Sequence, residues 1–148
     1  MKSNAIEAWL AFSNAVSIMR NEFSHSLRAH ELSLMEFRIL RHLCDNGSTS
    51  MAKLADELMI TKAGITLLTD RLEDRKLVRR VRREGDRRLI FITVTAGGKR
   101  KFACARKDYD SLIERRLGRL DESELETFTN VVGKLGEGEK ISSRLAER

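Results

Sequence analysis

The sequence predicts a mainly α-helical protein with one small β-hairpin, an α+β fold in which helices dominate. The 148 residues contain 41% hydrophobic and 34% charged residues and no proline, a composition typical of one helix-rich globular unit. Apolar residues recur at every third or fourth position over most of the chain, as amphipathic helices require. Two runs rich in β-branched or aromatic residues, 77–82 and 89–94, break this pattern and predict two strands.

The N-terminal segment predicts one long amphipathic helix of about six turns or more. Its apolar residues follow one another at spacings of three and four: Ile6, Trp9, Phe12, Val16, Met19, Phe23 and Leu27. This stripe is too long to be covered by a small core alone. We therefore expect it to pack against a second copy of the chain or against a C-terminal helix.

The middle of the chain predicts a helix-turn-helix. Ser33 and Glu36 have the spacing of a capping box and open a helix that ends in the turn 45–48. A short helix follows, with Leu54, Ala55 and Leu58 on one side. Thr61 then has the residue type of an N-cap for the last helix. Ile65, Leu68 and Leu72 are expected to face inward on that helix. Ala63, Thr66 and Asp70 are expected on the opposite side, with Lys62 and Thr69 flanking them.

A basic hairpin is predicted directly after this unit. The window 75–88 contains eight basic and two acidic residues, so its net charge of +6 equals that of the whole chain. The link 83–88 between the two expected strands contains Gly85 among polar residues, as a hairpin loop requires. A helix-turn-helix followed directly by a basic hairpin is a winged helix. Because the net positive charge is confined to this one segment, it indicates contact with a polyanion.

Two further helices are predicted after the hairpin. Thr95 is expected to cap a long one with an apolar stripe that includes Phe102, Ala105 and Leu112. Asp121 and Glu124 have the spacing of a second capping box. The inward face of the final helix is expected to consist of Leu125, Phe128, Val131, Val132 and Leu135.

The remaining reactive side chains predict neither a metal site nor a catalytic site. Cys44 and Cys104 both fall at apolar helical positions, so we expect buried, inert thiols rather than a redox switch. The three histidines lack metal-ligand spacing, and the pair Gly97-Gly98 lacks the context of a phosphate-binding loop. No apolar run approaches the roughly 18 residues of a membrane span. We expect a cytoplasmic protein that is not an enzyme, with no cofactor and no membrane partner.

The block from Thr61 to Arg100 resembles the MarR-type winged-helix transcription regulators. The matching features are DRLE at the end of the recognition helix, LV-R in the first strand, Asp86-x-Arg88 at the wing tip and Thr95-x-x-Gly98 after the second strand. The long flanking helices also fall where that family has its dimerisation helices. One departure is the absence of a glycine in the turn 74–77, so that Arg75 or Lys76 is expected to adopt a left-handed backbone conformation, or the helix to end differently.

The resemblance implies a homodimer that binds double-stranded DNA with two winged-helix lobes, roughly 34–36 Å apart in consecutive major grooves. It divides the chain into a DNA-binding domain, 33–98, and a helical dimerisation region, 1–32 with 99–148. The dimerisation residues are then expected to be Trp9, Phe12, Val16, Leu125, Phe128 and Val132. Some members of the family release DNA in response to a small aromatic acid or an oxidant. The first helix here lacks the cysteine of the oxidant-sensing members.

On the recognition helix, the expected DNA-binding residues are Thr61, Lys62, Ala63, Thr66 and Asp70, with Thr61 near a phosphate. The short side chains of Ala63 and Thr66 would allow close approach and contact with thymine methyl groups. Leu67 could make the same contact or could be packing. The alternative is that these are surface residues selected for helix propensity.

On the wing, the expected DNA-binding residues are Arg79, Arg80, Arg82, Arg83, Asp86, Arg87 and Arg88. Most of the arginines are expected to contact phosphates or to be solvated. The resemblance implies that one of them, Arg87 or Arg88, enters the minor groove. Asp86 is expected to orient it through a hydrogen bond, the alternative being that Asp86 only caps the turn.

The favoured function is therefore that of a dimeric, sequence-specific transcriptional regulator, either repressor or activator, that binds a pseudo-palindromic operator and that a small aromatic or other effector ligand could release. Three alternatives stay open. The winged helix could bind RNA or protein, the chain could be a nonspecific architectural DNA-binding protein, or it could bind small molecules and carry a vestigial wing.

Overall fold

The computed structural model describes the backbone of residues 2–83 and 86–136 and the side chains of residues 4–82 and 89–136. The chain is mainly helical with a small antiparallel sheet, which confirms the expected fold class. The elements, in chain order, are α1 (Lys2–Arg28), α2 (Leu34–Asn46), β1 (Thr49–Ser50), α3 (Met51–Leu58), α4 (Lys62–Asp74), β2 (Val78–Arg83), β3 (Asp86–Val94), α5 (Ala96–Leu117) and α6 (Glu122–Gly136).

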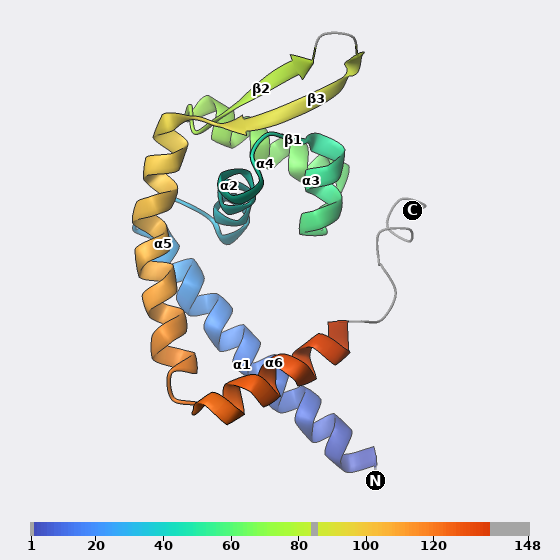
Figure 1. Ribbon diagram of the computed structural model, residues 1–148, viewed down its shortest axis with the longest axis vertical. Helices are drawn as coiled ribbons and strands as arrows, with labels where there is room; N and C mark the ends of the chain where they lie inside the picture. The colour runs from blue at the N-terminus through green and yellow to red at the C-terminus, as the bar shows by residue number, and fades with distance from the viewer. Residues whose placement is uncertain (1, 84–85, 137–148) are drawn as a thin grey trace.

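The helices α2, α3 and α4 and the sheet form one lobe around an apolar core (Figure 1). The helices α1 and α5 lead away from this lobe, and α6 lies at the opposite end of the molecule from the hairpin of β2 and β3. Aromatic rings join the two long helices to the lobe. The rings of Phe23 and Tyr109 stack at 4.3 Å between centroids, and Phe37 on α2 lies 5.2 Å from Phe102 and 4.6 Å from Tyr109.

The predicted helix ends are confirmed. Ser33 and Glu36 form a reciprocal capping box at the start of α2, and the hydroxyls of Thr61 and Thr95 accept hydrogen bonds from backbone N–H groups at the starts of α4 and α5. Asp121 and Glu124 form the same reciprocal pair at α6. These contacts stabilise helix termini whose first N–H groups have no partner within the helix.

The turn between α4 and β2 contains a left-handed residue, as the missing glycine suggested. That residue is Lys76, with φ 57°, whereas Arg75 has φ −85°. The backbone N–H of Lys76 donates to the carbonyl of Glu73, and that of Leu77 donates to the carbonyl of Leu72. These bonds close the end of α4 and direct the chain into the wing.

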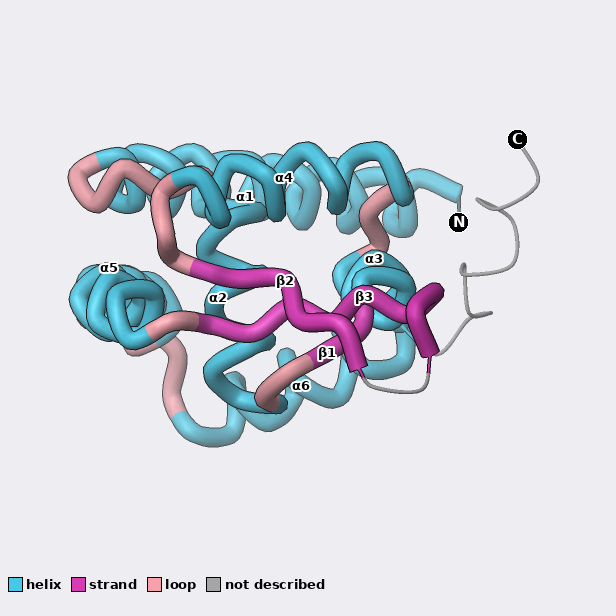
Figure 2. The backbone as a smooth tube through the Cα atoms, turned by 90° about the horizontal axis from the view of Figure 1, so that it is seen from above, coloured by secondary structure: helices cyan, strands magenta, loops and turns pink. Residues whose placement is uncertain are grey.

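The sheet has three strands in the order β1-β3-β2, so the predicted hairpin is correct but incomplete (Figure 2). The strand β1 was not predicted: Thr49 pairs with Ile92, and Ser50 pairs with Phe91. The hairpin is also longer than expected, because β2 extends to Arg83 and β3 begins at Asp86, with a register shift between Arg82 and Arg83.

Two burial expectations are wrong. The apolar residues of α6 do not face inward in the single chain, since the helix has no buried residue, and Phe128, Val131, Val132 and Leu135 are exposed. Cys104 is exposed, and only Cys44 is partly buried. Burial raises the pKa of the Cys44 thiol above its ordinary value, which disfavours the reactive thiolate form. Among the described helices, none is long and apolar enough to cross a membrane.

Candidate nucleic-acid interface

The recognition helix α4 is fixed in the lobe by one face. Ile65, Thr69 and Leu72 are buried on that face, whereas Ala63, Leu67 and Asp70 are exposed on the opposite face. Thr69 was expected on the flank, but its side chain is fully buried. Its hydroxyl can lie inside because it hydrogen-bonds the carbonyl oxygens of Ile65 at 2.7 Å and of Thr66 at 3.0 Å.

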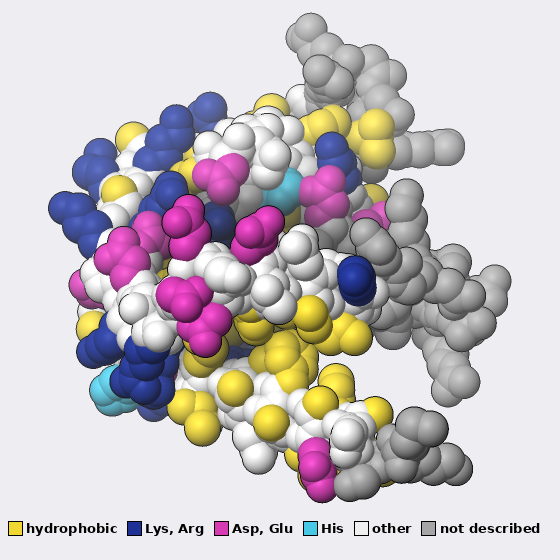
Figure 3. Space-filling view, turned by 60° about the horizontal axis from the view of Figure 1, so that its bottom comes forward, with side chains coloured by type: hydrophobic (Ala, Val, Ile, Leu, Met, Phe, Trp, Pro, Cys, Tyr) yellow, Lys and Arg dark blue, Asp and Glu magenta, His cyan; other side chains and the backbone are white. Residues whose placement is uncertain are grey.

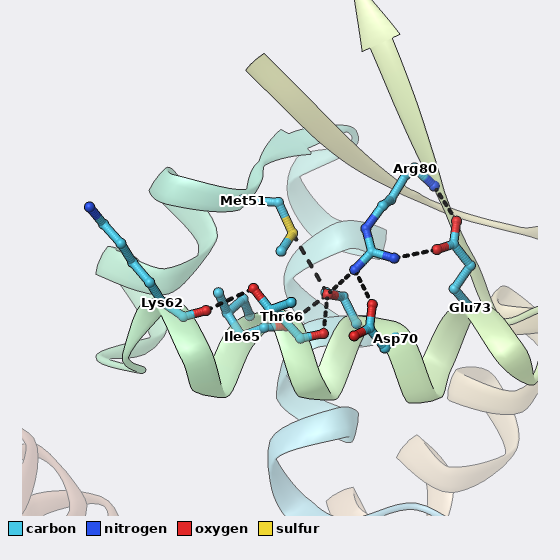
Figure 4. Close-up of polar contacts among 8 residues, drawn as sticks. Met51, Lys62, Ile65, Thr66, Asp70, Glu73 and Arg80 are labelled. Carbon is cyan, nitrogen blue, oxygen red and sulfur yellow. Dashed lines mark hydrogen bonds and ion pairs between the residues drawn. The ribbon is translucent and has the colours of Figure 1, made fainter. Parts of the chain in front are cut away.

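The polar side chains at the start of α4 are engaged with their own helix. The hydroxyl of Thr61 accepts from the N–H of Gly64 at 3.1 Å. The hydroxyl of Thr66 donates to the carbonyl of Lys62 at 2.9 Å, although Thr66 is exposed. Lys62 itself extends into solvent away from the lobe (Figure 4). The side chains of Lys62, Ala63 and Thr66 are therefore on the surface, as expected.

Arg80 of the wing is clamped to the recognition helix (Figure 4). Its guanidinium donates to Glu73 and Asp70 at 2.5 Å each and to the hydroxyl of Thr69 at 3.1 Å. Its backbone N–H donates to the other carboxylate oxygen of Glu73 at 2.9 Å. Partial burial acts to lower the pKa of Arg80, but the hydrogen bond with Asp70 and the negative charge of Glu73 outweigh it and raise the pKa above its ordinary value.

This clamp uses three of the five guanidinium N–H donors of Arg80 within the protein, so Arg80 is less available to a phosphate than a fully exposed arginine. One carboxylate oxygen of Asp70 is likewise engaged with Arg80, although the Asp70 side chain is exposed on the helix surface. Strand alternation explains the position of Arg80. It lies on the same face of β2 as the buried Val78, and that face points toward α4. Sequence reasoning missed Glu73 and Thr69, since their roles depend on a strand that follows α4.

Two other wing arginines lie on the surface. The side chains of Arg79 and Arg82 are exposed, and within the described part of the chain neither forms an ion pair. The side chains of Arg83, Asp86, Arg87 and Arg88 lie outside the described residues. The roles expected for these four therefore stay predictions, although β2 and β3 pair Arg83 with Asp86 at the outer end of the wing.

A groove of about 930 Å³ separates the C-terminal half of α5 from the C-terminal half of α1. Arg116 bridges it by an ion pair with Glu22, and His30 lies 2.7 Å from Asp108 at its lobe end. Arg115 and Arg119 line the same groove and make no ion pair with a described residue. The groove therefore offers positive charge to a small anion.

Replacing Arg80 with alanine is expected to lower the free energy of unfolding by about 2 kcal/mol, because it removes charge-assisted hydrogen bonds and leaves two carboxylates close together. DNA affinity should fall because the wing is no longer fixed to α4. The slope of log affinity against log salt should not change, since Arg80 is not expected to displace a counterion. Chemical denaturation and fluorescence anisotropy at several salt concentrations measure these quantities.

Arg79→Ala is the matched control on the adjacent, exposed position. It should change stability by less than about 0.5 kcal/mol. In a dimer it should reduce the salt slope by roughly 1.8, because two phosphate contacts are lost. A reduced slope for Arg80→Ala would show instead that Arg80 contacts phosphate.

Comparisons with known proteins agree with this geometry. The MarR family model matches residues 30–89. The chain is 32% identical over 130 residues to the transcriptional regulator HosA of Escherichia coli, covering 79% of this chain and 96% of that protein. The structure of Sco3205 from Streptomyces coelicolor, a MarR family regulator in complex with DNA, superposes with a TM-score of 0.88 at 18% identity, covering 93% of this chain and 89% of that one. The structure of Bordetella bronchiseptica BpsR, whose DNA binding 6-hydroxynicotinic acid regulates, has the same fold, with a TM-score of 0.71 at 18% identity and coverage of 86% and 99%.

Proposed function

Since the chain belongs to the MarR family of DNA-binding transcriptional regulators, we propose that it acts as a homodimer on a pseudo-palindromic operator. Its role is regulation and not catalysis, as it is for its relatives. In this proposal the residues 33–98 form the DNA-binding domain, and the residues 1–32 and 99–148 form the dimerisation region. The proposal is supported above all by the exposed arginines Arg79 and Arg82 on the wing and by the large apolar side chains exposed along α1 and α6 at the opposite end of the molecule.

At the wing end, α4 enters the major groove and the hairpin follows the minor groove. Thr61 and Lys62 lie at the N-terminus of α4, where backbone N–H groups favour a phosphate. Arg79 and Arg82 contact phosphates, with Arg83 beside them, and either Arg87 or Arg88, oriented by Asp86, enters the minor groove. Arg80 does not touch DNA in this arrangement but keeps the wing at a fixed angle to α4.

At the other end, large apolar side chains are exposed along α1 and α6. Trp9 is 63% exposed, Val16 45% and Phe128 41%, and the neighbouring apolar residues are exposed as well: Ile6, Leu10, Ile18, Val131, Val132 and Leu135. Figure 3 shows hydrophobic side chains gathered at this end of the molecule. A patch of this kind on a globular protein indicates an interface. In the proposed dimer it is covered by the same patch of a second copy, with Phe12 and Leu125 at its edge.

The groove between α1 and α5 is the proposed effector site. Its exposed arginines, Arg115 and Arg119, suit the carboxylate of a small aromatic acid. A ligand there would contact α1 and α5 within the dimerisation region, and α5 packs directly on α2 of the DNA-binding domain. It could therefore change the distance between the two recognition helices.

Selection of bound duplexes from a random pool tests the proposal most directly. The expected product has two inverted half-sites whose centres are about 10–10.5 base pairs apart, and its affinity should fall steeply as salt rises. Sedimentation should show a dimer at micromolar concentration. Repeating the binding measurement with 6-hydroxynicotinic acid or another aromatic acid present tests the effector site.

Other outcomes would select the alternatives. Equal affinity for random and selected duplexes would indicate an architectural DNA-binding protein. Preference for RNA would indicate an RNA-binding winged helix. Affinity independent of salt would contradict phosphate contact by the wing.

A further inference from the structure

We propose that α4 reads its half-site mainly by apolar contact, with Leu67, supported by Ala63, packing against the C5-methyl groups of thymine. Leu67 is thereby the specificity-determining residue of the recognition helix. The inference rests on the proposed function, since it assumes that α4 enters the major groove. It goes further by naming the chemical group that the helix recognises.

Leu67 lies on the outward face of α4. Ala63, Leu67 and Asp70 follow one another at intervals of four and three, so they form one row on the helix. This row lies opposite the buried Ile65 and Leu72, and Leu67 is 53% exposed. Its side chain is therefore not needed to fill the core. Because Ala63 is short, Leu67 is the most prominent side chain in this row over the first two turns of α4.

The polar side chains beside Leu67 form hydrogen bonds within the protein. The Thr66 hydroxyl donates a hydrogen bond to the carbonyl oxygen of Lys62 at 2.9 Å. The carboxylate of Asp70 is held by Arg80 at 2.5 Å. Direct readout by hydrogen bonds requires free donors or acceptors that face the base edges. The donor of Thr66 and one carboxylate oxygen of Asp70 are thus already engaged, whereas the methyl groups of Ala63, Thr66 and Leu67 lie on the exposed side of the helix.

The remaining cations are better placed for the DNA backbone than for a central base pair. Lys62 lies in the first turn of α4, and Arg71 lies one turn beyond Leu67. Both side chains are exposed and long enough to reach a phosphate on either side of the groove. In the major groove the C5-methyl group of thymine is the one apolar feature of the base edges. Leu67 therefore matches thymine and no other standard base.

The test replaces thymine by uracil, one position at a time, in the duplex selected from the random pool. Uracil pairs like thymine and lacks only the methyl group. At one or two positions in each half-site the affinity of the full-length protein should fall about fourfold, the equivalent of one buried methyl group. Replacing both symmetry-related thymines should weaken binding roughly fifteenfold. 5-Methylcytosine at the same position should bind more tightly than cytosine.

The variant Leu67→Ala tests whether Leu67 is the residue that contacts the thymine methyl group. The exposed position and the high helix propensity of alanine should leave the fold and the dimer unchanged. The variant should bind the thymine and uracil duplexes within a factor of two of each other at the sensitive positions. Met35→Ala, which removes an exposed apolar side chain from α2, should retain the full fourfold difference.

If the wild-type protein binds the selected duplex specifically but every uracil substitution changes affinity by less than twofold, the readout by methyl groups is wrong and the proposed function stands. The same holds if Leu67→Ala keeps the thymine preference. If no sequence is enriched from the pool, sequence-specific regulation is wrong as well, and the inference falls with it.

Discussion

Phe128→Asp is expected to convert the protein into a monomer at micromolar concentration while the winged helix-turn-helix stays folded. Phe128 is 41% exposed in the single chain, on a helix without a buried residue, so the lobe does not depend on it. In a twofold-symmetric interface the substitution acts twice. Each copy loses about 2 kcal/mol of apolar burial, and each adds a carboxylate that is costly to desolvate. The dimer dissociation constant should therefore rise at least a thousandfold.

Analytical ultracentrifugation and binding to the selected duplex measure this effect. Affinity for the two half-sites should drop more than a hundredfold, because one lobe binds without the other. Asn130→Asp is the matched control, since it adds the same charge to the polar side of α6. It should remain a dimer with unchanged affinity. A dimeric Phe128→Asp variant would exclude this face of α6 from the interface.

The features that could be predicted from the sequence are those that depend on residues close to one another along the chain. The caps at Ser33, Thr61 and Thr95 satisfy N–H groups only three positions away, and the periodicity of each helix reflects its own buried face. The basic hairpin was also recognisable, because strand propensity and its turn occupy one short segment. The fold class and the exposed residues of α4 follow from such local information.

The features that could not be predicted depend on distant partners. The strand β1 has two residues, too few for an alternating pattern, and exists because β3 has a free edge beside it. Arg80 resembles its neighbouring arginines in sequence, and only the packing of β2 on α4 brings it to Asp70 and Glu73. The exposure of the apolar face of α6 is not predictable in this way, because the periodicity of a helix shows that one face is apolar but not which molecule covers that face.

The junction of wing and α5 provides the second large effect. The helix α5 begins against the turn that leads into β2. The Thr95 hydroxyl donates to the carbonyl oxygen of Lys76 at 2.7 Å. The backbone N–H of Thr95 donates to the carbonyl oxygen of Leu77 at 3.0 Å. Gly98 is buried one turn further on, and a β-carbon added there would lie 2.0 Å from the carbonyl oxygen of Leu77. Such a contact cannot be relieved by rotating a side chain, because both groups belong to the backbone.

Gly98→Ala is therefore expected to lower the free energy of unfolding on the order of 3 kcal/mol, even though alanine favours a helix by about 1 kcal/mol over glycine. Gly97→Ala should have the opposite sign, because its β-carbon would meet Thr95 and Lys76 at ordinary distances of 3.6 and 3.7 Å. Stability should rise by up to about 1 kcal/mol in that variant. Urea denaturation of both variants beside the wild type measures the contrast between two adjacent glycines. Equal effects at the two positions would mean that α5 does not pack this closely on the start of the wing.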